Sequence, residues 1–479
     1  MALRPLALSR HLDRDRDYYR SLVRIALPIS VQGLISASLN LIDNIMVARL
    51  DETSLAAVGL ANSIYFILAI ALFGVSSGLT VFIAQYWGRK DLEGVRRATG
   101  LGLLVSGGLA LVVAVATASF PGFFMRIFTA DPAVVDQGIV FLRRIAPSYP
   151  LAGLSFMFYG SMRCTEHAKL PLWPTTIALG LNTLLNYMLI YGNFGAPKMG
   201  VQGSATATLV ARVVEVVITI GIVYGLRLPA AVTWRQIFRV DARFLSRALK
   251  VSLPVVGNEG LWVLGISIYP AIYAHMGTDV IAAVTVSSTI DRLAFVLAVG
   301  MGNAAAAIVG KQIGAGRKDL AFRYGGLSLA IAPLLAVGIG AVVFLTRPYV
   351  LPWFGIQGAV LDHAMVLVAL GSATLWMKSF TMVSIVGVLR AGGDTVVAML
   401  LDVGALWFIA VPLASLGGLV FGWPLFAVYL CTSVDELVKG VASLWRFLSK
   451  KWIHDLVNVP ADALPVLSPD PALPEPEAP

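Results

Sequence analysis

Residues 88–92 read GRKDL, and the same five letters recur as residues 316–320, 228 positions later. Two further pairs repeat at an offset of 226: residues 24–28 (RIALP) with 250–254 (KVSLP), and residues 56–58 with 282–284 (AAV in both). A nearly constant offset indicates two homologous halves of similar length. Duplication inside a hydrophobic chain is typical of secondary transporters, which bind substrate near the interface of the repeats.

The composition excludes an ordinary soluble protein. Hydrophobic residues make up 58% of the 479 residues and charged residues only 13%, whereas soluble domains carry about 25% charge. The mean hydropathy of +0.81 likewise indicates an integral membrane protein. Both cysteines, Cys164 and Cys431, lie in apolar stretches outside any CxxC or Cys/His cluster, so we expect neither a disulfide nor a metal site.

Twelve apolar stretches are long enough to cross a bilayer as helices, for which about 20 residues suffice. The first half supplies residues 28–48, 55–85, 98–122, 138–162, 171–192 and 203–226. The second half supplies residues 248–274, 280–311, 323–346, 363–389, 396–418 and 423–447. The predicted fold is therefore an all-α membrane protein of two six-helix bundles.

An even number of spans per half gives both halves the same orientation, so the repeats are parallel and inverted repeats are excluded. The loops between spans two and three and between eight and nine, the central connection and the end of the last span hold most bases. These bases are Arg89, Lys90, Arg96, Arg97, Arg317, Lys318, Arg323, Arg235, Arg239, Arg243, Arg247, Arg446, Lys450 and Lys451. The positive-inside rule then places both termini and the central connection in the cytoplasm. This topology signal explains much of the net charge of +9, so we expect no nucleic-acid partner.

These boundaries predict the domain organisation. We expect a cytoplasmic N-terminal segment at 1–24, a bundle at 25–226, a basic connector at 227–247, a second bundle at 248–450 and a cytoplasmic tail at 451–479. The N-terminal segment lacks the apolar core and cleavage site of a signal peptide. From about residue 459 the tail is rich in Pro, Ala and acids, and we expect it to be disordered.

Four stretches together resemble the multidrug and toxic compound extrusion (MATE) family of cation-coupled antiporters. They are residues 43–47 (DNIMV) with 55–60 (LAAVGL), residues 182–192 around Asn182 and Asn186, Pro254 followed by Glu259, and residues 389–395 (LRAGGDT) followed by Asp402, Trp407 and Pro412. The resemblance covers about residues 20 to 455 and places the chain near the bacterial NorM, DinF and MepA branch. It implies two bundles that rock around a central cavity. In sodium-coupled relatives an acid precedes the arginine that matches Arg390 by about three turns, whereas residues 378–381 here read KSFT, which argues against that sodium site.

Asp43 is the strongest candidate for the coupling residue. An acid at the middle of a membrane costs about 2.5 to 3.5 kcal/mol on insertion scales and normally faces the interior of the bundle. We therefore expect Asp43 to bind the coupling proton. The alternative is a fixed acid, hydrogen-bonded to Asn44 or to a neighbouring helix and retained for packing.

Asn182 and Asn186 lie four residues apart and so share one face of the fifth span. Their amides are placed to hydrogen-bond Asp43 or substrate, and the resemblance implies that they line the cavity of the first half. The alternative is that they join helices, at about 0.6 kcal/mol per bond in membranes. Thr206 and Thr208 in the sixth span are weaker candidates for the same cavity.

In the second half, Glu259 is the second candidate for cation coupling and Asp402 a candidate for the cavity. The alternative for both is an internal ion pair, for instance with Lys378. Asp291 with Arg292, and Arg212 with Glu215, are close enough in sequence to neutralise each other. Two small-xxx-small pairs, Gly74 with Gly78 and Gly310 with Gly314, are expected to serve close helix packing.

The sequence therefore predicts an antiporter, not an enzyme, which exports organic cations in exchange for protons, with sodium as the alternative ion. We expect no cofactor, small-molecule substrates, and a monomer that crosses the bacterial inner membrane many times. A nucleotide-driven pump is disfavoured because GxxxxGK[ST] is absent from the sequence. A lipid-linked glycan flippase or a dedicated metabolite exporter of the same superfamily is the alternative, and the charge of the cavity discriminates between them.

Overall fold

The computed structural model describes residues 15–238 and 241–458, and within these the chain is helical, without a strand. The predicted N-terminal segment and the predicted disordered tail therefore lie largely outside the described residues. The first half contains α1 (Arg16–Ala48), α2 (Glu52–Gly88), α3 (Leu92–Ser119), α4 (Pro121–Phe128), α5 (Pro132–Ile145), α6 (Ser148–Cys164), α7 (Leu172–Tyr191) and α8 (Val201–Gly225). The short helix α9 (Trp234–Phe238) lies in the connector.

The second half repeats this order. It contains α10 (Ala242–Ile266), α11 (Ile268–Met276), α12 (Thr278–Gly314), α13 (Lys318–Val350), α14 (Gly358–Met382), α15 (Thr395–Ala405), α16 (Val411–Ser415), α17 (Leu425–Cys431) and α18 (Val434–Leu448). Three π-helical segments extend these helices: η5 (Val383–Leu389), η6 (Leu406–Ala410) and η7 (Leu416–Val420). Two 3₁₀ turns, η3 (Asn193–Gly195) and η4 (Leu351–Phe354), lie in loops.

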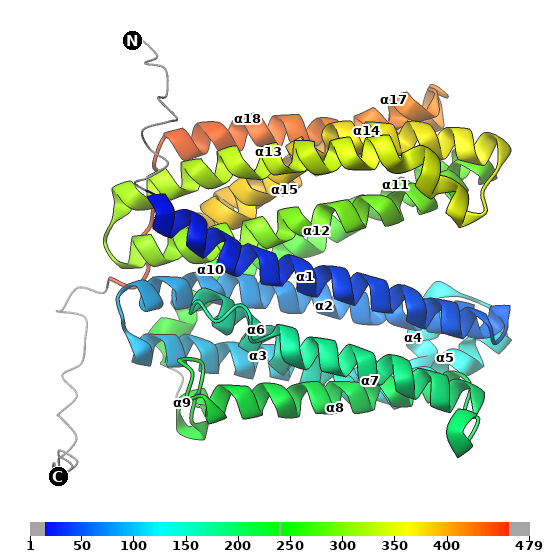
Figure 1. Ribbon diagram of the computed structural model, residues 1–479, viewed down its shortest axis with the longest axis horizontal. Coiled ribbons are helices and arrows are strands. Elements are labelled where there is room, and N and C mark those ends of the chain that lie inside the picture. The colour runs from blue at the N-terminus through cyan, green and yellow to red at the C-terminus, as the bar shows by residue number, and fades with distance from the viewer. Residues whose placement is uncertain (1–14, 239–240, 459–479) are drawn as a thin grey trace.

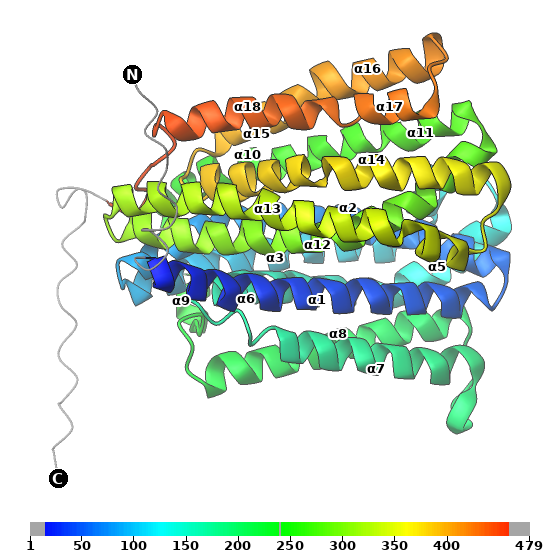
Figure 2. The same cartoon turned by 45° about the horizontal axis from the view of Figure 1, so that its top comes forward.

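The predicted twelve-span architecture is confirmed. Nine helices in the described part of the chain are long and apolar enough to cross a membrane. The other three crossings are α5 with α6, the short α7, and α17 with α18. Two of these crossings are each divided between two shorter helices, and α7 contains the polar Asn182 and Asn186. None of the three is therefore a single helix that is both long and apolar enough to be recognised as a span. Figures 1 and 2 show two layers of long, roughly parallel helices, one layer per half, with α1 along their boundary.

The repeated GRKDL motif forms a turn in both halves, but the following helix begins at a different position of the motif in each half. In the first copy Asp91 is the N-cap of α3 and its side chain accepts from the Gly94 amide. In the second copy the helix starts earlier, Arg317 is the N-cap, and Asp319 lies inside the first turn of α13. The helices themselves repeat at an offset of 226, since α2 ends at Gly88 and α12 at Gly314. Helix packing, not the motif, therefore defines the structural repeat.

The halves meet where α1 and α2 pack against α10 and α12. All four predicted packing glycines lie at this boundary. A Cβ at Gly74 would lie 2.9 Å from Val256 Cα, and one at Gly78 would lie 2.5 Å from Ser252 Oγ. A Cβ at Gly310 would contact Ala84, and one at Gly314 would overlap the carbonyl of Gln85. The small-residue pairs thus allow close approach of helices from different halves, as expected.

The end of the molecule at which α1 begins and α18 ends is closed by a strap, which we define as residues 452–457. Trp452 is fully buried in the core of the second half, whereas Val457 is buried in the core of the first half. Between them, Gln85 of α2 donates to the His454 carbonyl at 3.1 Å and accepts from the Leu456 amide at 2.9 Å. The predicted tail after residue 450 is therefore ordered at its start and joins the two halves.

Candidate functional site

Asp43 lies on α1 and faces α7. Its Oδ1 accepts a hydrogen bond from Asn186 Nδ2 at 2.9 Å. Asn182, one turn earlier on α7, places an amide atom 2.7 Å from Asp43 Oδ2. Both asparagines are buried, at 5% and 1% exposure for Asn182 and Asn186. The predicted grouping of Asp43 with the two asparagines is thus present, whereas the side chain of Asn44 lies outside the described residues.

The Asn182 amide is oriented by its neighbours to donate to Asp43. With its nitrogen toward the carboxylate, it donates to Asp43 Oδ2 at 2.7 Å, and its oxygen accepts from the Thr208 amide at 3.1 Å and from Thr208 Oγ1 at 3.2 Å. The opposite orientation would set the Asn182 nitrogen against the Thr208 N–H, which is also a donor. Asn182 and Asn186 therefore both donate to the carboxylate of Asp43.

An outer cavity of about 560 Å³ opens beside this group and is lined by Asp43, Asn182 and Thr208. The aromatic residues Tyr65 and Phe66 also line it, as does Arg292. Thr206 does not line this cavity, and its hydroxyl hydrogen-bonds the Gln202 carbonyl on its own helix.

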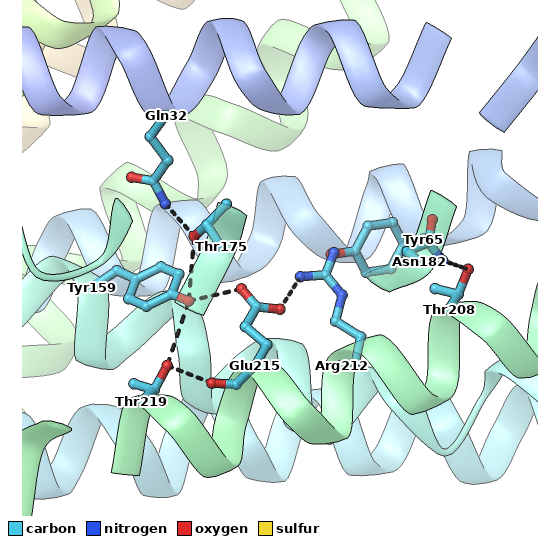
Figure 3. A network of polar contacts seen from close by, with 9 residues as sticks. All are labelled: Gln32, Tyr65, Tyr159, Thr175, Asn182, Thr208, Arg212, Glu215 and Thr219. Atoms are coloured by element: carbon cyan, nitrogen blue, oxygen red, sulfur yellow. Dashed lines mark hydrogen bonds and ion pairs between the residues drawn. The ribbon is translucent and has the colours of Figure 1, made fainter. Parts of the chain in front are cut away.

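A chain of polar contacts joins helices of the first half beside the outer cavity (Figure 3). Arg212 of α8 donates to Glu215 Oε2 at 2.7 Å, which confirms the predicted pair, and to the Tyr65 hydroxyl at 3.1 Å. Glu215 Oε1 accepts from the Tyr159 hydroxyl at 2.8 Å. Thr175 donates to that hydroxyl at 3.4 Å and accepts from Gln32 Nε2 at 2.8 Å. These contacts join α1, α2, α6, α7 and α8 through one buried acid.

An inner cavity of about 330 Å³ adjoins the outer one. It is lined by Gln32, Arg163 and Arg390, with hydroxyls from α2 and α6 around them. Arg163 Nη2 donates to Gln32 Oε1 at 3.1 Å. Arg163 Nε is buried and has no hydrogen-bond partner among the described residues.

The second half contains the same contact, but there the acceptor is a charged carboxylate. Arg390 Nη1 donates to Glu259 Oε1 at 2.7 Å, with side-chain exposures of 3% and 13%. The arginine follows its acceptor by 131 residues in both halves, since Arg163 and Gln32 have the same separation. Glu259 and Gln32 are therefore structural equivalents, and the candidate coupling acid of the second half is a paired acid.

Asp402 belongs to a second cluster in the same half. Lys439 of α18 lies 2.9 Å from Asp402 Oδ1, 2.7 Å from Asp435 Oδ2 and 3.7 Å from Glu436 Oε1. Asn258 Nδ2 donates to the other oxygen of Asp402 at 3.0 Å. Asp402 lines neither of the two cavities above.

The alternative for Glu259 and Asp402, an internal ion pair, is present, with other partners than Lys378. Lys378 pairs with Asp291 at 3.6 Å, whereas Glu259 and Asp402 have bases of their own. Arg292 does not neutralise Asp291, because consecutive helical residues point in different directions and Arg292 faces the outer cavity. Within residues 15–238 and 241–458, three or more His, Cys, Asp or Glu side chains nowhere gather in a way that would hold a metal ion.

Sequence reasoning missed Gln32, Tyr159, Arg163 and Thr175. Gln32, Tyr159 and Thr175 are uncharged and lie in apolar runs, so nothing in their immediate sequence marks them. Arg163 carried a signal that went unused: it precedes Arg390 by 227 residues, within the range of the repeat offset. A residue-by-residue alignment of the halves would have identified both arginines.

Comparison with known proteins agrees with this architecture. A family model described as MatE matches residues 28–188 and 263–416. The uncharacterized transporter YisQ of Bacillus subtilis is 24% identical over 450 residues, 93% of this chain and 98% of its own length. The multidrug resistance protein PmpM of Pseudomonas aeruginosa is 28% identical over 429 residues, 86% of each chain.

Solved structures show the same fold. One, described as the outward-facing conformation of a multidrug resistance MATE family transporter of the MOP superfamily, superposes with a TM-score of 0.82. It is 21% identical in sequence, and the match covers 90% of this chain and 96% of that one.

Proposed function

The chain belongs to the MatE family, and on that premise we propose that it is a secondary antiporter that exports organic cations in exchange for protons. The observation that carries this proposal is the surroundings of Asp43. Its carboxylate lies beside a cavity, is held by two asparagine amides, and forms no ion pair with any base in the described part of the chain. A carboxylate without a fixed counter-ion is free to bind either a proton or a cationic substrate.

Competition for Asp43 provides the exchange. When the cationic substrate occupies the outer cavity, the charged carboxylate attracts it and both asparagine amides donate to Asp43. When a proton arrives, Asp43 becomes neutral, its charge-assisted hydrogen bonds from the asparagine amides weaken, and the attraction for the cation disappears.

The aromatic rings of Tyr65 and Phe66 contribute to the same cavity. Aromatic faces attract organic cations by about 0.5 to 2 kcal/mol. Such contacts are tolerant of substrate shape, as a transporter of several drugs requires.

We place both termini in the cytoplasm of a bacterium, by the positive-inside rule. The strap and the glycine contacts then close the cytoplasmic side, and the outer cavity faces the other side. In this orientation Asp43 receives protons from outside, where a respiring cell maintains the higher proton activity.

The energy available limits the exchange. One charge that crosses 100 mV supplies about 2.3 kcal/mol. A monovalent cation exchanged one-for-one for a proton moves no net charge and depends on the pH gradient alone. We therefore expect transport of monovalent dyes to follow the pH gradient and to respond little to voltage.

Ethidium efflux from proteoliposomes tests the proposal, with a pH gradient and a sodium gradient imposed separately. We expect the pH gradient to drive efflux through the wild type and not through Asp43→Asn. Efflux driven by sodium alone would assign the coupling to another ion and would direct attention to Glu259.

A lipid-linked glycan flippase or a dedicated metabolite exporter is the second candidate, and Arg163 in the inner cavity is the observation that favours it. A flippase of that kind needs a basic cavity, whereas Asp43 and Glu215 place acids beside the bases here. Absence of ethidium efflux under both gradients, with folded protein, would favour this candidate.

A further inference from the structure

The two halves differ in charge at equivalent positions of their arginine contacts. In the second half Glu259 neutralises Arg390 at 2.7 Å. In the first half the uncharged Gln32 stands in that place, 3.1 Å from Arg163. The side chain of arginine stays protonated in proteins, so Arg163 is a cation that no acid pairs with in the described part of the chain.

The nearby polar contacts do not supply the missing charge. Gln32 leads through Thr175 and Tyr159 to Glu215, but Glu215 already pairs with Arg212 at 2.7 Å. Gln32 therefore connects Arg163 only to an acid that already has a base of its own.

The charges that line the inner cavity leave Arg163 in excess. They are Arg163, Arg212, Glu215 and Arg390. Arg212 forms an ion pair with Glu215, and Arg390 forms one with Glu259, which does not itself line the cavity. Because a buried charge without a partner is costly, the cavity favours an anion that enters with the substrate.

The surroundings of Arg163 suit such a group. Only Nη2 of its guanidinium makes a hydrogen bond within the described structure. The hydroxyl of Ser155, which also lines the cavity, is buried without a partner there. At about 330 Å³ the cavity is at the lower end of the sizes that hold small ligands.

The inner cavity adjoins the outer one. Residues that line both are Ser36, Tyr65, Ala69, Thr175, Arg212 and Glu215. The two cavities therefore adjoin along this wall, with the carboxylate of Asp43 on one side and the guanidinium of Arg163 on the other.

We propose that Arg163 is a binding residue for the carboxylate of amphoteric substrates, which carry a cationic group toward Asp43 and an acidic group in the inner cavity. The inference rests on the proposed function, because the cationic group of the substrate would bind at Asp43 as proposed above. It adds that the substrates also carry an acidic group. A guanidinium binds a carboxylate through paired N–H donors, and Gln32 leaves those donors free where Glu259 would occupy them.

Two dyes that differ in one group test the proposal: rhodamine 110, with a free carboxylate, and rhodamine 123, its methyl ester. Their dissociation constants are measured by fluorescence anisotropy on the purified full chain in detergent. In Arg163→Gln we expect the affinity for rhodamine 110, relative to rhodamine 123, to fall by about tenfold or more, as the loss of a charged hydrogen bond predicts. Arg163→Lys should retain part of the preference, because it keeps the charge.

Gln32→Glu is the more specific test, since it places beside Arg163 the same acid that Glu259 places beside Arg390. We expect it to reduce the relative affinity for rhodamine 110 as much as Arg163→Gln does, although Arg163 is still present. Binding of rhodamine 123 reports that each variant is folded.

An unchanged ratio of the two affinities in both Arg163→Gln and Gln32→Glu would overturn the carboxylate site and leave the proposed antiporter intact. Failure of the wild type to bind either dye would contradict both. Rhodamine 110 binding that depends on Arg163, without export under a pH gradient, would support the site and contradict the antiporter.

Discussion

Gln32 and Glu259 occupy equivalent places in the two halves of the chain, and each accepts a hydrogen bond from an arginine 131 residues later. The duplication has therefore kept the geometry of a contact and changed its charge. Within the described residues, the second half has an ion pair at this contact, whereas in the first half neither Arg163 nor Asp43 has a counter-ion. For this reason we propose that substrate and proton bind in the first half and that the matching contact in the second half is structural.

The Arg390–Glu259 pair provides the first prediction. Removal of one partner leaves a buried charge, so we expect Glu259→Gln to destabilise the fold by about 3 kcal/mol. Arg390→Gln should have a similar effect, and the double variant should lose less than the sum, because both charges are then gone. Thermal unfolding in detergent measures this, with Lys378→Gln, from the looser 3.6 Å pair, as the milder control. Additive losses would show that the two residues do not interact.

Close packing at the strap end provides the second prediction. A side chain at Gly314 would overlap the Gln85 carbonyl, so Gly314→Leu should prevent closure of that end. We expect a cysteine placed at Ala84, in a background without Cys164 and Cys431, to react faster with a hydrophilic maleimide in this variant. Gly338→Leu is the control, because a Cβ there meets open space. Equal rates in both variants would contradict a closed end.

Trp452 provides the third prediction. It is fully buried, and its indole donates to the Phe447 carbonyl at 3.0 Å. Truncation of a buried tryptophan costs about 3 to 5 kcal/mol, so Trp452→Ala should lower the melting temperature markedly. Trp445→Ala, at a position 73% exposed, is the matched control and should change it little. A small effect of Trp452→Ala would show that the strap does not contribute to stability.

Asp394, in the loop before α15, provides a prediction about pH. Burial acts to raise the pKa of Asp394, but His454 and Arg446, whose Nε is 2.6 Å from Asp394 Oδ2, outweigh it and hold that pKa below its usual range. A lowered pKa in the folded state means that the stabilisation is complete above the ordinary aspartate pKa and is lost as pH falls through the folded value. We expect Asp394→Asn to be less stable than wild type at pH 7 and to approach it at acidic pH. A constant difference in melting temperature across this range would contradict the assignment.

The sequence predicted the helical spans better than it predicted which side chains contact each other. The twelve spans, the packing glycines and the grouping of Asp43 with Asn182 and Asn186 follow from apolar length, repeat offset and residues four apart on one helix face. The partner of Glu259 does not follow from such patterns, because it depends on the rotation and lateral position of helices far apart in the chain. The alternative of an ion pair named Lys378 as an example of a partner, whereas the structure places Lys378 beside Asp291 and Arg390 beside Glu259.

The charge difference between the halves could be read from the sequence only after the structure had aligned them. RIALP repeats at an offset of 226 and GRKDL at 228, whereas Gln32 and Glu259 are 227 residues apart. One position turns a helical side chain by about 100°. The offset of 226 matches Gln32 with Asn258, and the hydrogen bonds to the two arginines are what pair Gln32 with Glu259.

The central claim is that proton and cation compete for Asp43. Proton release on binding tests it most directly: ethidium is added to the purified protein in weakly buffered solution, and the protons released per bound ethidium are measured by a pH indicator. The account predicts release by the wild type and by Glu259→Gln, and none by Asp43→Asn at concentrations where ethidium still binds. The same release from Asp43→Asn as from the wild type would contradict it.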